Sequence, residues 1–185
     1  MTAFTRIIIV LSILRQALGT AQTPPNQVMI GIALVATILV MQPTYEKLNQ
    51  QAIAPYLAGE MAGDVAIEQG LTVVKRFMLA NTKEADLIAF ADLVGGKTFK
   101  RIDDVPITIA APAFVASEMR TGFEMGFMLF IPFLVIDLVI ASILMSLGMM
   151  MVSPMLVSLP FKLLLFVSVD GWAMTIGSLV QSYGK

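Results

Sequence analysis

The sequence predicts an all-α membrane protein in which hydrophobic helical hairpins flank an inserted small polar helical domain. Of the 185 residues, 57% are hydrophobic and 14% are charged, and the mean hydropathy is +0.84. These values lie far from those of a soluble globular domain. The charged residues are also concentrated, because 18 of the 25 lie between Gln42 and Thr121. Apolar residues recur at helical spacing, and Ile107-Thr-Ile109 is the only candidate strand.

The charge distribution divides the chain into three parts. N-terminal hydrophobic helices are expected at 1–41, a polar helical domain at 42–121 and a C-terminal hydrophobic hairpin at 122–185. The first apolar segment runs from Phe4 to Leu18. The sequence Ala17-Leu-Gly-Thr-Ala21 imitates a signal-peptidase site, so a signal peptide is the alternative interpretation of this segment.

A second helix is expected to open after Pro24-Pro25, with Asn26 as its cap, and to close before Pro43, because proline interrupts a helix. Its apolar part, Val28 to Met41, has 14 residues. It would measure about 21 Å, whereas the hydrocarbon core of a bilayer is about 30 Å thick. This helix is therefore predicted to be too short to span a membrane comfortably.

The polar region is predicted to form short helices. Asp64 is expected to cap the first of these, and Thr82 to start the next. Gly95-Gly96 marks a loop, and Pro112 is expected in the first turn of a helix that leads into the C-terminal region. The apolar positions of the first helix, three or four residues apart, are Ile67, Leu71, Val74 and Met78.

The third apolar segment, 122–151, would form a straight helix of about 45 Å, longer than a bilayer requires. Pro132 removes a backbone donor and is expected to kink this helix. Only Val152-Ser-Pro154 separates it from a fourth segment, Met155 to Val180, which predicts a tight helical hairpin. Helices of such uneven length suit packing on other protein, so we expect a helical oligomeric assembly associated with the membrane.

Gly122 and Gly126 form a GxxxG pattern just after the polar region. Small residues four apart lie on one helix face and let a second helix approach closely. Such pairs also arise by chance in an apolar chain rich in glycine and alanine. The pattern indicates a helix-packing site and leaves the chance interpretation open.

The residue types present exclude most catalytic chemistry. The chain has no cysteine and no histidine, which removes thiol nucleophiles, the usual zinc sites and imidazole bases. Its carboxylates are scattered rather than set at metal-ligand spacing. Gly96-Lys97-Thr98 fails as a phosphate-binding loop because the pattern needs a glycine where Ala91 stands, so a solvated turn is predicted. We expect no enzyme activity, no cofactor and no metal, and the net charge of −1 gives no reason to expect nucleic acid.

Three charged residues interrupt the C-terminal apolar segments: Asp137, Lys162 and Asp170. Charges inside a membrane segment usually face protein or water, and across a hairpin the lysine can pair with either carboxylate. One interpretation is a proton or ion relay, as in a small ion-coupled transporter. The other is structural pairing that fixes how helices or subunits dock.

Met149-Met150-Met151 ends the third apolar segment. Methionine is flexible and polarisable, so a ring of these side chains from several subunits can close an opening and yield to passing chains. Ordinary gap-filling is the alternative, because the chain contains 14 methionines and packing is their usual role.

Seven stretches of the chain together carry a family resemblance. They are Phe4-Thr-Arg-Ile-Ile-Ile-Val10, Arg15-Gln-Ala-Leu-Gly19, Pro25-Asn-Gln-Val28, Phe130-Ile-Pro-Phe-Leu-Val-Ile-Asp137, Gly148-Met-Met-Met151, Leu159-Pro-Phe-Lys162 and Asp170-Gly-Trp172. With them the chain resembles the FliP family of the flagellar type III export gate and its injectisome counterparts. The resemblance runs from end to end and is weakest in the polar middle.

This resemblance implies a homo-oligomeric subunit that assembles with FliQ and FliR, in contact with FlhB, into a closed channel at the flagellar basal body in the bacterial inner membrane. Unfolded flagellar proteins would pass through that channel. The resemblance also implies that the polar domain lies on the periplasmic side and that Met149, Met150 and Met151 form a gasket around the pore. It makes Asp137, Lys162 and Asp170 buried docking charges rather than ion carriers.

One departure from the family pattern concerns the N-terminus. Family chains usually begin with a cleavable signal and half a hydrophobic segment, whereas this sequence begins at Met1-Thr-Ala-Phe4, inside what resembles the first conserved helix. We expect a truncated, processed or internally started chain. The resemblance also argues against a signal peptide at Phe4 to Leu18.

Overall fold

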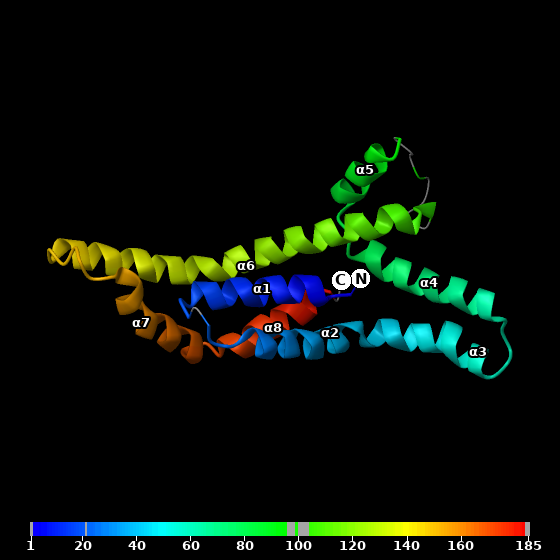
Figure 1. Cartoon of the computed structure of the whole chain (residues 1–185), viewed down its shortest axis with the longest axis horizontal. Coiled ribbons are helices and arrows are strands. Elements are labelled where there is room, and N and C mark those ends of the chain that lie inside the picture. The colour runs from blue at the N-terminus through cyan, green and yellow to red at the C-terminus, as the bar shows by residue number, and fades with distance from the viewer. Residues whose placement is uncertain (1, 21, 96–98, 100–103, 184–185) are drawn as a thin grey trace. The chain divides into compact units, whose positions relative to one another are not determined.

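The computed structural model describes residues 2–20, 22–95, 99 and 104–183, and within them it confirms the all-α class. The turn expected at Gly96 to Thr98 lies outside the described residues. The helices, labelled in Figure 1, are α1 (Phe4–Ala17), α2 (Asn26–Leu48), the π-helical η1 (Asn49–Ile53), α3 (Ala54–Leu57), α4 (Gly63–Ala80), α5 (Glu84–Leu93), α6 (Ile107–Ser146), α7 (Pro154–Ser168) and α8 (Gly171–Gln181).

The described helices belong to two compact units. The first contains the residues up to Thr5 together with Thr37–Arg120, and the second contains Arg6–Ala36 together with the residues from Thr121 onward. The long helices α2 and α6 each contribute to both units. The expected division at 41 and 121 stays a prediction.

The expected end of the second helix before Pro43 is wrong. Helix α2 continues through Pro43 to Leu48, and η1 and α3 extend the helical run to Leu57. Proline disrupts a helix mainly by removing one backbone donor and crowding the preceding turn, and neighbouring structure can absorb that cost. The predicted shortness of this helix is therefore wrong too.

Helix α6 begins earlier than expected and runs for 40 residues. Ile107-Thr-Ile109, the candidate strand, forms its first turn, because the backbone N–H groups of Ile109 and Ala110 donate to the carbonyl of Pro106. Pro112 therefore lies in the second turn of the helix, not in the first.

The polar region contains the expected helices with shifted starts. Asp64 lies in the first turn of α4 instead of capping it, since the N-cap is Ala62. Lys83, not Thr82, occupies the N-cap position of α5. Thr82 instead donates its hydroxyl to the carbonyl of Met78, at the end of α4.

The core of the first unit packs α4 and α5 against the first turns of α6. Phe114 is fully buried and meets the ring of Phe77 edge-on at 6.0 Å between centroids. Two contacts fix α5: the amide of Lys83 donates to Ser117 Oγ, and Asp86 pairs with Arg120 at 2.7 Å.

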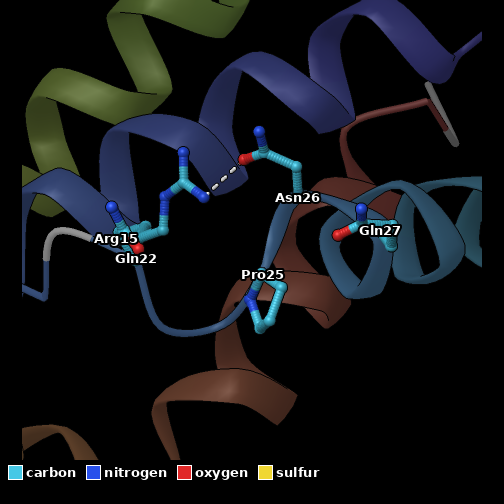
Figure 2. Close-up of a pocket in the computed structure, with 5 residues that line it drawn as sticks. All are labelled: Arg15, Gln22, Pro25, Asn26 and Gln27. Atoms are coloured by element: carbon cyan, nitrogen blue, oxygen red, sulfur yellow. Dashed lines mark hydrogen bonds between the residues drawn. The ribbon is translucent and has the colours of Figure 1, made fainter.

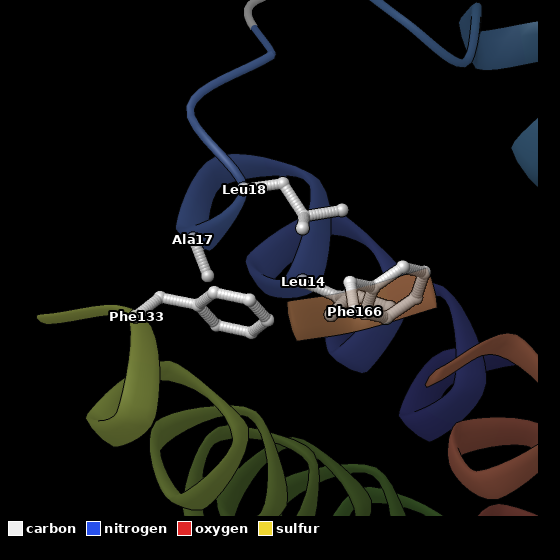
Figure 3. Close-up of a cluster of buried hydrophobic side chains, with 5 residues drawn as sticks. All are labelled: Leu14, Ala17, Leu18, Phe133 and Phe166. Carbon is white, nitrogen blue, oxygen red and sulfur yellow. The ribbon is translucent and has the colours of Figure 1, made fainter. Parts of the chain in front are cut away.

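The core of the second unit gathers side chains from α1, α6 and α7 (Figure 3). Phe166 of α7 lies between Phe133 of α6 and Trp172 of α8, with ring centroids 6.3 and 5.3 Å away. A side chain at Gly171 would collide with the Phe166 ring, so glycine is required where α8 begins. Figure 1 shows α1 beside α6 in this unit.

Two helical runs in the described residues are long and apolar enough to cross a membrane: Asn26–Leu57, with 32 residues, and Ile107–Ser146. The pair α7 and α8 would count as a third if it forms one span, although it is bent by 61°. The predicted fourth segment is thus one arm broken at Val169 and Asp170.

Candidate functional site

Asp137 and Lys162 lie against each other across the α6–α7 hairpin. The Lys162 ammonium is 2.6 Å from Asp137 Oδ2. The lysine side chain is almost fully buried, whereas the aspartate side chain is 28% exposed. Of the two carboxylates that sequence reasoning offered, the lysine is paired with Asp137.

The pair is completed by two further groups. Ser158, four residues before Lys162 on α7 and fully buried, donates its hydroxyl to Asp137 Oδ1 at 2.5 Å. Lys162 also donates to the backbone carbonyl of Ala17 at 3.0 Å. That carbonyl belongs to the last residue of α1, where helical carbonyls lack intrahelical partners and the helix dipole is negative. One ammonium group therefore ties the end of α1 to both arms of the hairpin.

A glycine turns the chain at the end of α1. Gly19 follows α1 with a φ of +76°, a left-handed conformation that suits glycine at the end of a helix. A side chain there would lie 3.8 to 3.9 Å from Leu159, Met155 and the Lys162 ammonium. The backbone after α1 thus passes directly over the α7 face that carries the lysine.

Asp170 lies apart from this cluster. It forms the corner between α7 and α8 with a φ of 51°, its side chain is exposed, and it occupies the N-cap position of α8 without a side-chain capping bond. Aspartate tolerates this left-handed conformation better than most residues.

The methionine turn, residues 147–153, joins α6 to α7 and is built around Gly148. The Gly148 N–H donates to Met145 and the Met149 N–H donates to Leu144, which together form a Schellman motif. Gly148 has a φ of +74°, as the motif requires. Pro154 then opens α7 at its first position.

The motif directs the three methionines away from the subunit. Met149 is 48% exposed, Met150 is 86% exposed and Met151 is fully exposed. By contrast, Met29, Met41 and Met78 are buried. The gap-filling interpretation thus describes the buried methionines and not the turn, because exposed side chains fill no gap within this subunit.

Gly122 and Gly126 face α1 at two successive turns. A side chain at Gly122 would lie 3.2 Å from Ile9 Cγ2, and one at Gly126 would overlap Ile13 Cδ1 and lie 3.0 Å from Ile13 Cβ. Ile9 and Ile13 are themselves four residues apart. The two four-residue spacings therefore match along the α1–α6 contact.

Pro132 lies within α6, which continues through it to Ser146. It lines an apolar cavity of about 230 Å³, to which Phe133, Phe166, Met174 and the buried Thr175 also contribute. The kink expected at this proline stays a prediction.

Sequence reasoning missed Ser158 and the carbonyl of Ala17. The four-residue spacing of Ser158 and Lys162 places both on one face of α7, so this signal was present. No sequence pattern reveals the carbonyl, because every residue carries one. No group of three or more acidic side chains in the described part of the chain is placed to hold a metal.

These features define an all-α membrane-type protein with an ion pair between a buried lysine and a half-buried aspartate, and with an exposed methionine turn. Comparison with known proteins gives the family: residues 1–179 match the model of the FliP family. The chain therefore belongs to the FliP family, and the resemblance drawn from the seven sequence stretches is confirmed.

Several curated relatives are flagellar biosynthetic proteins FliP. Those of Cereibacter sphaeroides, Pectobacterium carotovorum subsp. carotovorum and Bacillus subtilis are 61%, 52% and 47% identical to this chain, each over 99% of its length. The chain covers 61%, 71% and 83% of those proteins, respectively. It thus spans about three fifths of the Cereibacter sphaeroides relative.

Proposed function

We propose that this chain is a core subunit of the flagellar type III protein export gate in the bacterial inner membrane. Family membership and the two helical runs of membrane length support this role. In the proposed assembly several copies combine with FliQ and FliR, in contact with FlhB, around a closed channel for unfolded flagellar proteins. The polar region at 42–121 lies on the periplasmic side, and the hydrophobic parts at 1–41 and 122–185 pack as helical hairpins against other subunits or lipid.

The methionine turn is the observation that carries the proposal. Three consecutive apolar side chains stand exposed at the tip of a hairpin, held there by a Schellman motif. Exposed apolar side chains at a fixed position indicate a surface that meets other protein. Copies arranged in a ring bring these flexible side chains together, and they close the pore while adapting to chains of different sequence.

The exposed apolar surface supports assembly with other subunits. Along α6 after Gly126, side chains such as Phe127, Met128 and Leu138 are at least 60% exposed. In an assembly they are covered by neighbouring subunits or by lipid. The Asp137–Lys162 pair then keeps each hairpin in the conformation that packs against neighbouring subunits.

The contacts favour this role over ion-coupled transport by Asp137, Lys162 and Asp170. Asp137 is already neutralised by Lys162, and its other oxygen accepts from Ser158. An ion carrier needs a carboxylate that can exchange partners, whereas a fully bonded pair suits docking.

The proposal is tested by replacing Met150 and Met151 with alanine in the intact cell. This change keeps the backbone bond of Met149 and removes the side chains that form the seal. We expect the complex to assemble and the inner membrane to leak small solutes. Replacing the exposed Met119 and Met174 with alanine provides the matched control, in which the membrane should remain impermeable. An intact permeability barrier in the turn variant contradicts the proposed seal.

A second measurement tests the ring. The chain has no native cysteine, so Met150→Cys introduces a single thiol at the turn. Under oxidation it should cross-link copies of the subunit, whereas Leu93→Cys, at an equally exposed position on α5, serves as the control. Recovery of monomer alone from Met150→Cys argues against a central ring.

A further inference from the structure

A polar cavity of about 390 Å³ lies in the second unit, where α1 ends and α2 begins (Figure 2). Its volume is within the range of small-molecule sites. Two of the stretches that carry the family resemblance supply four of its five lining residues, and the proposed export role makes no use of the cavity. The lining residues are Arg15, Gln22, Pro25, Asn26 and Gln27.

Arg15 is the charged group of this cavity. Its Nη1 donates to Asn26 Oδ1 at 2.6 Å, as Figure 2 shows. The same nitrogen also donates to the carbonyl of Pro24 at 3.3 Å. Both contacts use one nitrogen, so Nε and Nη2 donate to no group in the described part of the chain. The contacts hold the guanidinium in place and leave three N–H groups for a ligand.

No carboxylate in the described part of the chain pairs with this charge. Arg15 forms no ion pair with any described residue, and the sequence contains no Asp or Glu before Glu46. The remaining polar side chains of the lining are amides, which can donate hydrogen bonds as well. A fixed guanidinium with free donors, surrounded by amides, selects an anion with several acceptor oxygens, and a phosphate group is the best geometric match.

The surface next to the cavity is apolar. From Val28 onward, α2 exposes Val28, Leu34 and Val35 within the same unit, by 48%, 52% and 70%, respectively. Gly31 on this face has open space around it. The first residues of α2 line the polar cavity, and its following turns expose apolar side chains. This order fits a molecule with a phosphate at one end and hydrocarbon at the other.

We propose that this cavity binds a phosphate group, and that a phospholipid headgroup at the membrane surface supplies it, with its acyl chains along α2. Arg15 binds the phosphate oxygens through Nε and Nη2, and the Asn26 and Pro24 contacts orient the guanidinium. The site does not depend on the methionine seal, so each proposal can fail without the other.

The test measures lipid retained by the full chain in native mass spectrometry, after release from detergent micelles. The probes are phosphatidylglycerol and a diacylglycerol with the same acyl chains but no phosphate. We expect the chain to retain phosphatidylglycerol at least about tenfold more strongly, because a charge-assisted hydrogen bond contributes about that factor. Equal retention of the two lipids overturns the proposal.

Three variants locate the binding. Arg15→Gln removes the charge, and Gln27→Glu adds an opposing carboxylate while keeping the bonds of Arg15. Each should reduce retention of phosphatidylglycerol to the diacylglycerol level. Arg76→Gln, which removes an exposed arginine of α4, should leave it unchanged. Unchanged retention in well-folded Gln27→Glu, or the same loss in Arg76→Gln, contradicts the site.

Titration with inorganic phosphate distinguishes whether the bound phosphate group comes from a lipid headgroup or from a soluble ligand. Weak competition, with lipid retained at millimolar phosphate, supports a lipid headgroup. Complete displacement at micromolar phosphate supports the phosphate chemistry but assigns the site to a soluble ligand, and overturns the lipid assignment.

Discussion

Replacement of Gly126 by alanine tests the α1–α6 contact. The new Cβ would overlap Ile13 Cδ1 and lie 3.0 Å from Ile13 Cβ, closer than a side chain normally tolerates. The Ile13 Cβ is fixed to the backbone of α1, so a rotamer change alone cannot relieve the contact. Helix α1 must move away from α6, or Ile13 must adopt a strained rotamer.

Two opposing terms set the size of the effect. Alanine stabilises a helix by about 1 kcal/mol relative to glycine. Overpacking of a close contact costs about 1 to 3 kcal/mol. Gly31→Ala gains the first term without the second, because no atom lies within 4 Å of its new Cβ. We therefore expect Gly126→Ala to be less stable than Gly31→Ala by about 1 to 3 kcal/mol.

The assay is the thermal midpoint of the detergent-solubilised protein, measured by the fraction that stays monodisperse after heating. For a chain of this size, 1 kcal/mol corresponds to about 2 to 4 °C. Gly122→Ala, whose closest contact is 3.2 Å, should fall between the two variants. Ile13→Val removes the overlapping Cδ1 and should recover part of the loss in Gly126→Ala. Equal midpoints for Gly126→Ala and Gly31→Ala would refute the packing argument.

Two further predictions concern the hairpin. Lys162→Met leaves Asp137 without its cation, so it should lower stability by about 3 kcal/mol in the same assay and abolish assembly. The double variant with Asp137→Asn should recover part of this stability. If Asp137→Asn alone abolishes export while assembly and stability stay unchanged, the docking role is wrong. Gly148→Ala should cost about 1 kcal/mol because of its positive φ, and Gly148→Asn should cost less, so equal effects would argue against the Schellman geometry.

The helices that sequence reasoning located best are those with clear periodicity. Helix α1 ends at Ala17, one residue from the predicted Leu18, because an apolar repeat and a glycine mark its limits. Helix α4 likewise contains the predicted apolar positions, but Ile67 and Leu71 are exposed and Met78 is the member of the stripe that is buried. The failures concern proline. Local rules treat Pro43 and Pro112 as helix boundaries, whereas α2 and α6 continue through them, because a long helix loses only one backbone donor at each proline and keeps its other bonds.

Sequence reasoning about the candidate site meets a similar limit. Residue type and position were enough to single out Asp137 and Lys162, because charges are rare in apolar segments. Their pairing, and the exclusion of Asp170 from it, depend on where the α7–α8 break falls. That break occurs at Val169 and Asp170, where a positive φ turns the chain, and a pattern of apolar residues does not encode this angle.

Helix α6 connects the ion pair to the methionine turn. Asp137 precedes Gly148 by 11 residues, which is about 16 Å of helix. Lys162 and Ser158 fasten α6 to α7 at that depth, and Gly126 fastens α6 to α1 three turns earlier. The methionine turn therefore extends beyond the contacts that hold α6 against α7 and α1. Its backbone position is fixed by these contacts, whereas its side chains remain exposed. The proposed seal needs this combination: the fixed backbone would define the ring, and the flexible methionine side chains would supply a contact that adapts to chains of different sequence.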